Sequence, residues 1–196
     1  VTYTPTANYS GSDSFTFTVS DGTTTSSAAT VSITVNAVND APTATAQSVS
    51  GNEDAAQSIT LAGSDPDGDS LTYAIASAPS NGNASVSGNT VTYTPTANYS
   101  GSDSFTFTVS DGTATSSAAT VSITVNAVND APTATAQSVS GNEDAAQSIT
   151  LAGSDPDGDS LTYAIASGPS NGSASLSGNT VTYTPTANYS GSDSFT

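Results

Sequence analysis

Apolar and small polar side chains alternate with a period of two along most of the chain. The clearest cases are FTFTV at residues 105–109 and VSITV at residues 121–125, where every second residue is apolar. Successive side chains of a β-strand point to opposite faces, so this pattern predicts strands with one face in a core and one in water. The same rule predicts strands in SITL, LTYAI and VTY, at residues 58–61, 71–75 and 91–93.

Short turn signals separate the predicted strands. PDGD, PSNGN, SGN, NYSG and SDG combine Pro, Gly, Asn, Asp and Ser, the residue types that favour tight turns. No segment shows the apolar spacing of an amphipathic helix of useful length. Roughly six or seven short strands in about 90 residues are typical of an immunoglobulin-like sandwich. We therefore expect an all-β chain of Greek-key β-sandwiches.

The sequence repeats itself with a period of 90 residues. VTYTPTANYSGSDSFT begins at Val1, at Val91 and at Val181, and such a period indicates a linear array of similar domains. Near-identity of the copies indicates recent duplication, so sameness between them does not show which positions matter. Residues 1–106 and 91–196 differ at four aligned positions, all mildly: Thr24/Ala114, Ala78/Gly168, Asn83/Ser173 and Val86/Leu176.

The predicted boundary between repeats lies in VNAVNDAPTA, where a last strand ends and NDAP forms a stiff junction. The chain then contains the C-terminal part of one repeat at residues 1–40, a complete repeat at residues 41–130 and the N-terminal part of a third at residues 131–196. Two explanations of the incomplete repeats stay open. The segment is a window on a long repetitive polymer, or strands of a neighbouring chain complete its open end by β-strand complementation.

Charge adds a constraint to this picture. The chain has 17 acidic residues and no Lys, Arg or His, so its formal net charge is −17. Self-repulsion at this charge opposes the compact state, and we expect metal ions to supply the missing cations. The lack of basic side chains argues against binding to nucleic acid, and the lack of Cys removes disulfides and zinc–sulfur sites. Apolar runs are too short to cross a bilayer, which takes about 20 residues.

The carboxylates cluster in predicted turns rather than on strand faces. The loop GSDPDGDSL has Asp at every second position and occurs twice. Ca²⁺ takes about six to eight oxygen ligands, and alternate Asp residues around a glycine let successive carboxylates converge on one ion. Mg²⁺ fits less well, because it demands a tight octahedron and gives up water reluctantly. The acids of the two loops are Asp65, Asp67, Asp69, Asp155, Asp157 and Asp159.

Alternating strand directions gather the acidic turns at two poles of a sandwich. On a seven-strand topology, the DPDGD loop and the SDG turn with Asp111 belong at the pole that faces the preceding NDAP junction. The NED segment, with Glu53 and Asp54, falls with Asp103 toward the opposite pole. Oxygen ligands are therefore expected to come from two successive repeats and their linker.

The combined motifs resemble a known class of repeats. VSDG…VSITVNAVNDAP is similar to the end of a cadherin repeat, where an Asp-Gly turn precedes the last strand and a calcium-binding linker. NDAPTA…NEDAAQSITLAGSDPDGDSLTYAI…VTYTPTANYSGSDSFTFTVSDG resembles more closely the bacterial cadherin-like repeats of giant secreted adhesins and biofilm matrix proteins. The resemblance covers the whole chain and implies a secreted, extracellular or cell-surface bacterial protein that binds Ca²⁺.

The resemblance also implies a ligand set. Glu53 matches the acidic residue near the first strand of a cadherin repeat, Asp65 and Asp67 match its D-x-D pair, and Asp111 matches a further Asp of the same pole. The linker residues are matched by Asn39–Asp40 and Asn129–Asp130. The candidate metal ligands are Asn39, Asp40, Glu53, Asp54, Asp65, Asp67, Asp69, Asp103, Asp111, Asn129, Asp130, Glu143, Asp144, Asp155, Asp157 and Asp159.

The sequence departs from the cadherin pattern in three places, one of which is that the Asn following the Asp of the cadherin NDN linker is missing. Ala37 and Ala127 stand where the first Asp of the linker would be. No D-R-E sequence exists, and Asp103 is only an approximate substitute for it. We therefore expect roughly one to three Ca²⁺ ions per junction between repeats.

These features favour a calcium-rigidified structural or adhesive repeat without catalytic residues. It would act as an extender or fibre-forming segment of a bacterial surface or biofilm matrix protein. Its expected partners are neighbouring repeats and identical chains in a fibre, through strand complementation or lateral packing. A carbohydrate-binding module is an alternative, although the chain has no Trp platform. A carboxylate-based glycoside hydrolase is another, although the acids lie in repeated turns without a cleft signature.

Overall fold

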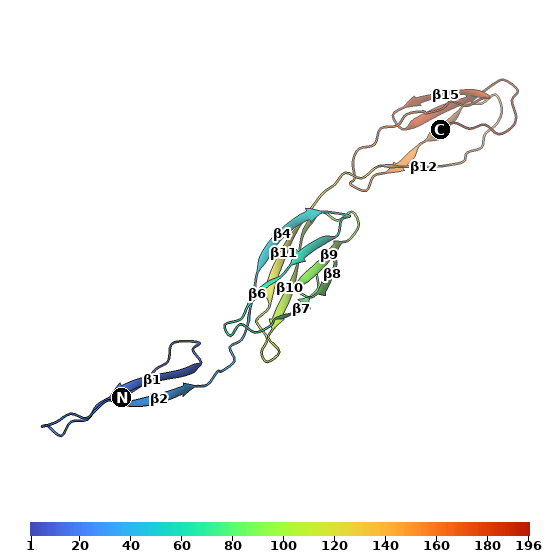
Figure 1. Cartoon of the computed structure of the whole chain (residues 1–196). Coiled ribbons are helices and arrows are strands. Elements are labelled where there is room, and N and C mark those ends of the chain that lie inside the picture. The colour runs from blue at the N-terminus through green and yellow to red at the C-terminus, as the bar shows by residue number, and fades with distance from the viewer. The chain divides into compact units, whose positions relative to one another are not determined.

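The computed structural model describes residues 1–196 as an all-β chain, and it contains no helix that could cross a membrane. The chain divides into two compact units, Val1–Ala127 and Val128–Thr196 (Figure 1). The all-β tandem architecture predicted from the alternating pattern and the repeat is confirmed.

The first unit contains a two-stranded hairpin and a sandwich. The hairpin consists of β1 (Gly11–Phe17) and β2 (Ala29–Val35), which pair antiparallel. The strands of the sandwich are β3 (Thr43–Thr45), β4 (Gln47–Asn52), β5 (Gln57–Thr60), β6 (Ala62–Ser64), β7 (Thr72–Ser77), β8 (Gly82–Ser87), β9 (Thr90–Pro95), β10 (Gly101–Ser110) and β11 (Ala119–Asn126).

Two sheets face each other in this sandwich. One has the strand order β4-β11-β10-β7, in which β4 runs parallel to β11 and the other neighbours are antiparallel. The other is antiparallel with the order β5-β9-β8, and β3 and β6 form a short separate ladder. The predicted strand segments lie in β5, β7, β9, β10 and β11, so the period-two reading located the main strands.

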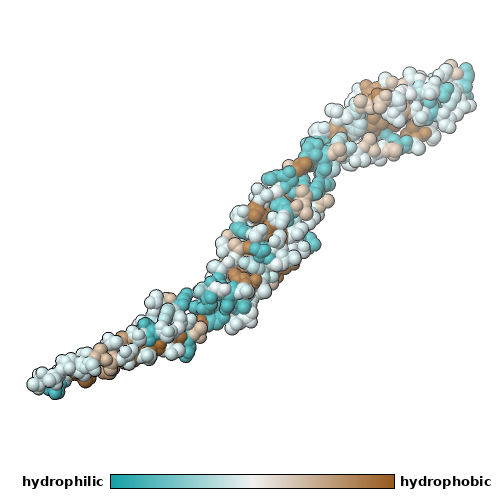
Figure 2. Space-filling model, viewed as in Figure 1, coloured by the Kyte–Doolittle hydropathy of each residue, from teal (hydrophilic) through white to brown (hydrophobic).

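The core lies between the two sheets and is built from every second residue of their strands. The inward side chains of β10 are Phe105, Phe107 and Val109, and Phe107 stacks on Tyr73 with ring centroids 6.4 Å apart. The outward positions of β10 and β11 are mostly Ser and Thr. Figure 2 shows a visible face on which pale residues of intermediate hydropathy predominate, interrupted by hydrophilic and hydrophobic patches. Burial of alternate apolar residues therefore holds the sheets together.

The second unit has fewer strands than the sandwich of the first. Residues 137–142 repeat the sequence of β4, QSVSGN, and residues 162–167 stand where β7 does, yet neither segment forms a strand. β4 pairs with β11, which has no counterpart among residues 128–196, and β7 pairs with β10, which is represented only in part. The strands are β12 (Thr133–Thr135), β13 (Gln147–Thr150), β14 (Ala152–Ser154), β15 (Gly172–Ser177) and β16 (Thr180–Pro185).

Two copies of one phenylalanine test how far tertiary context sets stability. Phe107 is 0% exposed, whereas its counterpart Phe17 in the hairpin is 45% exposed. Phe107→Ala leaves a cavity in the core, so we expect it to lower the free energy of unfolding of the sandwich by about 3–5 kcal/mol. The measurement is denaturant unfolding of the full chain in dilute solution.

Phe17→Ala is the matched control and should change the unfolding of the sandwich by less than about 1 kcal/mol. Equal losses for the two variants would contradict the difference in burial.

Candidate metal centre

The DPDGD loop brings three carboxylates together. Ligand oxygens of Asp65, Asp67 and Asp69 lie within 4.8 Å of one another. The backbone forces this approach, because Asp65 Oδ1 accepts the N–H groups of Asp67 at 2.9 Å and of Asp69 at 3.2 Å. Gly68 N–H donates to the Asp65 carbonyl at 3.3 Å, and its φ of +81° is one that glycine adopts without strain. The loop therefore curls around the first acid.

One oxygen of this cluster is buried without a hydrogen-bond partner. Asp65 Oδ1 accepts two N–H groups, but Asp65 Oδ2 is inaccessible to solvent and accepts none. A buried carboxylate oxygen without a partner is costly, and the chain has no Lys, Arg or His to pair with it. A hard cation that prefers oxygen ligands fits this donor set.

The linker before the sandwich is bonded to the same loop. Asp40 N–H donates to Asp67 Oδ2 at 2.7 Å. The Asn39 side-chain amide donates to the Asp40 carbonyl at 3.0 Å and to Asp111 Oδ2 at 2.9 Å. The predicted gathering of the NDAP linker, the DPDGD loop and the SDG turn at one pole thus matches these contacts.

Asp111 holds its own turn together. Its Oδ1 accepts the N–H groups of Thr113 and Ala114, both at 2.6 Å. The pKa of this carboxyl lies below its ordinary value, chiefly because of the Ala114 N–H, then the Asn39 amide and the Thr113 N–H. The group is therefore ionised at neutral pH and adds a fourth negative charge beside the loop.

The carboxylate cluster and its hydrogen bonds recur in the second unit. Asp155, Asp157 and Asp159 have ligand oxygens within 4.8 Å of one another, and Asp155 Oδ1 again accepts the N–H groups of the other two, at 3.0 and 3.2 Å. Asp130 N–H donates to Asp157 Oδ2 at 2.7 Å, and the Asn129 amide donates to the Asp130 carbonyl at 2.9 Å. Residues 128–196 contain no counterpart of Asp111.

The predicted ligands of the NED segment belong to other contacts. Glu53 is 3% exposed and its N–H donates to the Asn126 carbonyl at 3.0 Å. Asp54 has a φ of +57° and accepts the N–H of Asn98 at 3.1 Å, so it shapes a turn. In the second unit Asp144 repeats this bond to Asn188 at 2.8 Å, and Glu143 is exposed. None of these four carboxylates belongs to a three-acid cluster, so their metal role stays a prediction.

Asp103 is a buried acceptor within the sandwich. It is 8% exposed and accepts the N–H groups of Ser80 (3.0 Å), Asn81 (3.0 Å) and Ser104 (2.8 Å) and the hydroxyl of Tyr93 (2.9 Å). Its carboxylate ties the segment between β7 and β8 to β10. We therefore leave Asp103, and its counterpart Asp193, out of the proposed ligand set.

Sequence reasoning missed these partners, although one signal was available. Position 103 has the same parity as Phe105 and Phe107, so its side chain points toward the core. Burial raises the pKa of the Asp103 carboxyl, but its four hydrogen bonds outweigh burial and leave the pKa below its ordinary value. Burial, followed by the bond to Asp103, raises the pKa of the Tyr93 hydroxyl.

Family comparison agrees with this architecture. The model of the bacterial Ig domain family matches residues 39–124 and 129–196, and that of the cadherin-like domain family matches residues 1–36. The chain therefore belongs to the bacterial Ig domain family, and its resemblance to cadherin-like repeats is confirmed. Such repeats are extracellular or surface modules of adhesive or structural type and are typically not enzymes. No curated protein matches the chain.

Solved structures are similar to the chain at low sequence identity. An endo-fucoidan hydrolase, MfFcnA4 from glycoside hydrolase family 107, is 22% identical, with a TM-score of 0.42 over 98% of this chain and 32% of that one. Protocadherin gamma B2 domains 1-5 are 16% identical, with a TM-score of 0.47 over 81% and 35%. The human desmocollin-1 ectodomain is 15% identical, with a TM-score of 0.40 over 86% and 35%. The chain spans only 32–35% of these proteins, and nothing about its function follows from them.

The hydrogen-bonded Asp103 carboxylate generates a stability prediction. Asp103→Asn replaces one acceptor oxygen by a donor that faces N–H or O–H groups, so we expect the sandwich to lose about 1–3 kcal/mol at pH 7. The carboxylate has a lower pKa folded than unfolded. Its contribution is therefore complete above the unfolded value of about 3.9 and is lost as the pH falls through the folded value.

Thermal melting between pH 2 and pH 7 measures this effect: the gap between wild type and Asp103→Asn should close below about pH 4. The control is Asp13→Asn, which changes the same sequence context in the hairpin, where the acid is exposed. A gap that persists unchanged at low pH would contradict the assignment.

Proposed function

We propose that this chain is a calcium-stiffened repeat of an extracellular bacterial protein, acting as an extender or fibre-forming segment. The observation that carries the proposal is the buried, unpartnered Oδ2 of Asp65 within a cluster of three carboxylates. One Ca²⁺ ion there would give this oxygen a partner and relieve the mutual repulsion of the three acids.

Asp65, Asp67, Asp69 and Asp111 are the acidic ligands in the first unit, with the side-chain oxygen of Asn39, main-chain carbonyls and water to complete the shell. Ca²⁺ accommodates such a mixed and flexible set of oxygens, whereas Mg²⁺ demands a tighter octahedron. Glu53, Asp54 and their counterparts Glu143 and Asp144 remain proposed ligands as well. We keep the expected roughly one to three ions per junction.

The hydrogen bonds of the linker explain why metal binding would stiffen the chain. Asp40 and Asn39 are bonded to Asp67 and Asp111, two carboxylates of the proposed site. An ion held by those carboxylates would fix the linker as well as the loops. Each ion would also offset part of the charge of −8 in residues 41–130, which contain eight acids and no basic residue. A chain with many such metal-stiffened linkers would be long and stiff, and this length and stiffness would be its function.

No contact favours the alternative functions. The acids that lie close together are in a turn bonded to the linker, and the buried acid Asp103 is saturated by four hydrogen bonds. A glycoside hydrolase needs one carboxyl able to donate a proton and one free to attack or to activate water. Neither the clustered acids of the turn nor Asp103 provides such a pair of carboxyl groups.

Calcium titration of the metal-free 196-residue chain tests the proposal. We expect heat of binding in calorimetry and a rise in melting temperature, with a weaker response to Mg²⁺. At a free Ca²⁺ concentration one hundred times Kd, linkage raises the free energy of unfolding by about 2.7 kcal/mol per site. A chelator should reverse the effect and make the chain more flexible in small-angle scattering.

Paired variants locate the site. Asp65→Asn/Asp67→Asn should remove the binding of one loop and leave that of Asp155 and Asp157, and the fourfold variant should abolish it. Asp13→Asn/Asp21→Asn is the matched control, because it changes the net charge equally at two exposed acids of the hairpin. Unchanged melting and scattering with Ca²⁺ and with chelator would overturn the proposal.

A further inference from the structure

The two facing sheets of the sandwich between Thr43 and Asn126 end in four edges, because neither sheet closes into a barrel. β4 and β7 are the edges of one sheet, and β5 and β8 are the edges of the other (Figure 1). The unpaired N–H and C=O groups of an edge strand can pair with another chain. Proteins normally prevent this with charges, proline, a bulge or a covering segment. The four edges differ in how far they are protected in this way.

Three of the four edges have such protection. The Gln47 side-chain amide of β4 donates to the Thr60 carbonyl of β5 at 3.2 Å. The Gln57 side chain of β5 fills the space that a Cβ at Gly51 of β4 would need. These glutamines join the edges of β4 and β5 to each other. The pairing of β7 with β10 shifts register once, and an irregularity of this kind twists an edge away from a straight partner strand.

β8 has none of these devices. It contains no proline, its pairing with β9 shows no register shift, and residues 70–102 around it contain no charged side chain. It has a neighbouring strand on one side only. The outward side chains Asn83, Ser85 and Ser87 are exposed, neutral and small, whereas Ala84 and Val86 point inward and are half-buried. β8 is therefore a regular, uncharged and open edge.

The hydrogen-bond pattern shows which backbone groups of β8 face this open side. In an antiparallel pair, hydrogen-bonded and non-hydrogen-bonded residue pairs alternate. Thr96 N–H donates to the Asn81 carbonyl at 2.8 Å, and these two residues directly precede the first pair in the β8–β9 register. Every second residue from position 81 is therefore bonded to β9. The N–H and C=O groups that point away from β9 belong to Gly82, Ala84 and Val86.

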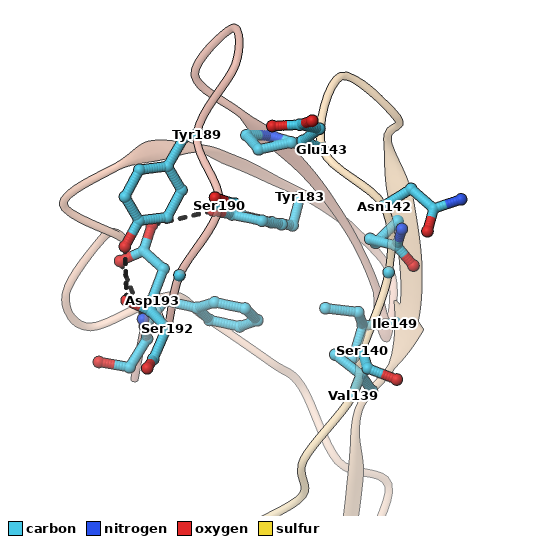
Figure 3. Close-up of a pocket in the computed structure, with 16 residues that line it drawn as sticks. Val139, Ser140, Asn142, Glu143, Ile149, Tyr183, Tyr189, Ser190, Ser192 and Asp193 are labelled. Carbon is cyan, nitrogen blue, oxygen red and sulfur yellow. Dashed lines mark hydrogen bonds between the residues drawn. The ribbon is translucent and has the colours of Figure 1, made fainter.

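The same edge recurs in the second unit. β15 pairs with β16 in the register of β8 and β9, and Thr186 N–H donates to the Asn171 carbonyl at 2.9 Å. Tyr183 of β16 donates its hydroxyl to Asp193 at 3.0 Å (Figure 3), so the strand behind the edge is anchored as β9 is. The residues of β15 whose backbone groups point away from β16 are Gly172, Ala174 and Leu176.

We propose that β8 of one copy of this chain pairs antiparallel with β8 of a second copy, edge to edge, about a twofold axis at Ala84. Gly82 then lies opposite Val86 of the second copy, and Ala84 lies opposite its own equivalent. These pairs are hydrogen-bonded, because both members have outward-facing backbone groups. Such a contact uses the same surface on both copies and closes on itself. Since β15 offers the same surface, each chain has two such edges and joins more than one neighbour.

A second copy is the occupant that the chemistry of this edge favours, because the edge is complementary to itself. Its free backbone groups recur at every second residue and are centred on Ala84, so they match their own reverse order. Asn83 lies opposite Ser85 of the second copy, and this amide and hydroxyl can hydrogen-bond. The pair also covers more of Ala84 and Val86, which favours association.

The distribution of charge supports the same occupant. A chain with a net charge of −17 would attract a basic partner to its carboxylates, yet this edge carries none. An uncharged edge suits an uncharged strand, and the edge of a second copy is one. Two copies can therefore meet here without placing carboxylates opposite each other. β8 lies within the complete repeat at residues 41–130, and the inference does not depend on calcium.

Sedimentation velocity of the 196-residue chain over a range of concentrations tests the proposal. Chelator removes any bound Ca²⁺, and salt at about 0.15 M screens repulsion between chains beyond a Debye length of about 8 Å. We expect a concentration-dependent series of oligomers. A wild-type chain that stays monomeric at every concentration would overturn pairing between copies.

Charges on the outward side of the edge should prevent the contact. Asn83→Asp/Ser85→Asp places carboxylates opposite each other across the pair, and Ser173→Asp/Ser175→Asp, the β15 variant, does the same at β15. All four side chains are exposed, so each variant should keep its fold. We expect the β15 variant to stop at dimers, which form through β8, and the combined variant to stay monomeric. Oligomers of the combined variant as large as those of the wild type would contradict the assignment.

A matched control adds the same charge elsewhere on each unit. It changes four exposed serines of β4 and of its counterpart segment to Asp, namely Ser48, Ser50, Ser138 and Ser140. This control should assemble like the wild type, because the edges of β8 and β15 are unchanged. A monomeric control would show that net charge rather than this edge decides assembly, and the proposal would then be wrong.

Disulfide trapping tests the register of the contact. In the twofold pairing, position 83 lies opposite position 85 of the second copy in a non-hydrogen-bonded pair, with Cα atoms about 4.5 Å apart. This distance is within the range of a disulfide, and the chain has no Cys of its own. An equimolar mixture of Asn83→Cys and Ser85→Cys, both made in the β15 variant, should form mixed disulfide dimers faster than either protein alone. A mixture that cross-links no faster would overturn the twofold pairing.

Discussion

Seventeen carboxylates in a chain without a basic side chain are the constraint on which the rest of the structure depends. A buried carboxylate is costly unless it is hydrogen-bonded or paired, and here the protein can offer only N–H groups, hydroxyls and side-chain amides. Asp103 receives four such donors and Asp111 receives three. Asp65 accepts hydrogen bonds at only one of its two carboxylate oxygens. The turns therefore have to supply hydrogen-bond donors to the carboxylates that they carry. The Asp65 oxygen that receives no donor is the point at which an external cation fits.

Identical segments of this chain behave differently in different surroundings. The hairpin keeps its register in both copies, because the turn and the alternating pattern act locally. The burial of its side chains differs between the two copies, since Phe107 is covered by a second sheet and Phe17 is not. QSVSGN is a strand at residues 47–52, where β11 is its partner, and not at residues 137–142. Local sequence sets pairing within a hairpin, and tertiary contacts decide which face is a core.

The amino-acid sequence by itself determined the strands, the turns and the tandem sandwich, because alternation and turn chemistry act over a few residues. It also determined that the NDAP linker, the DPDGD loop and Asp111 lie at one pole, since alternating strand directions bring these turns together. It did not reveal that Asp103 is a saturated acceptor, because Ser80 and Asn81 reach it only through the packing of the β7–β8 segment on β10. The parallel pairing of β4 with β11 likewise joins residues about seventy positions apart. Such long-range partners leave no local period in the sequence, so only the tertiary structure decided them.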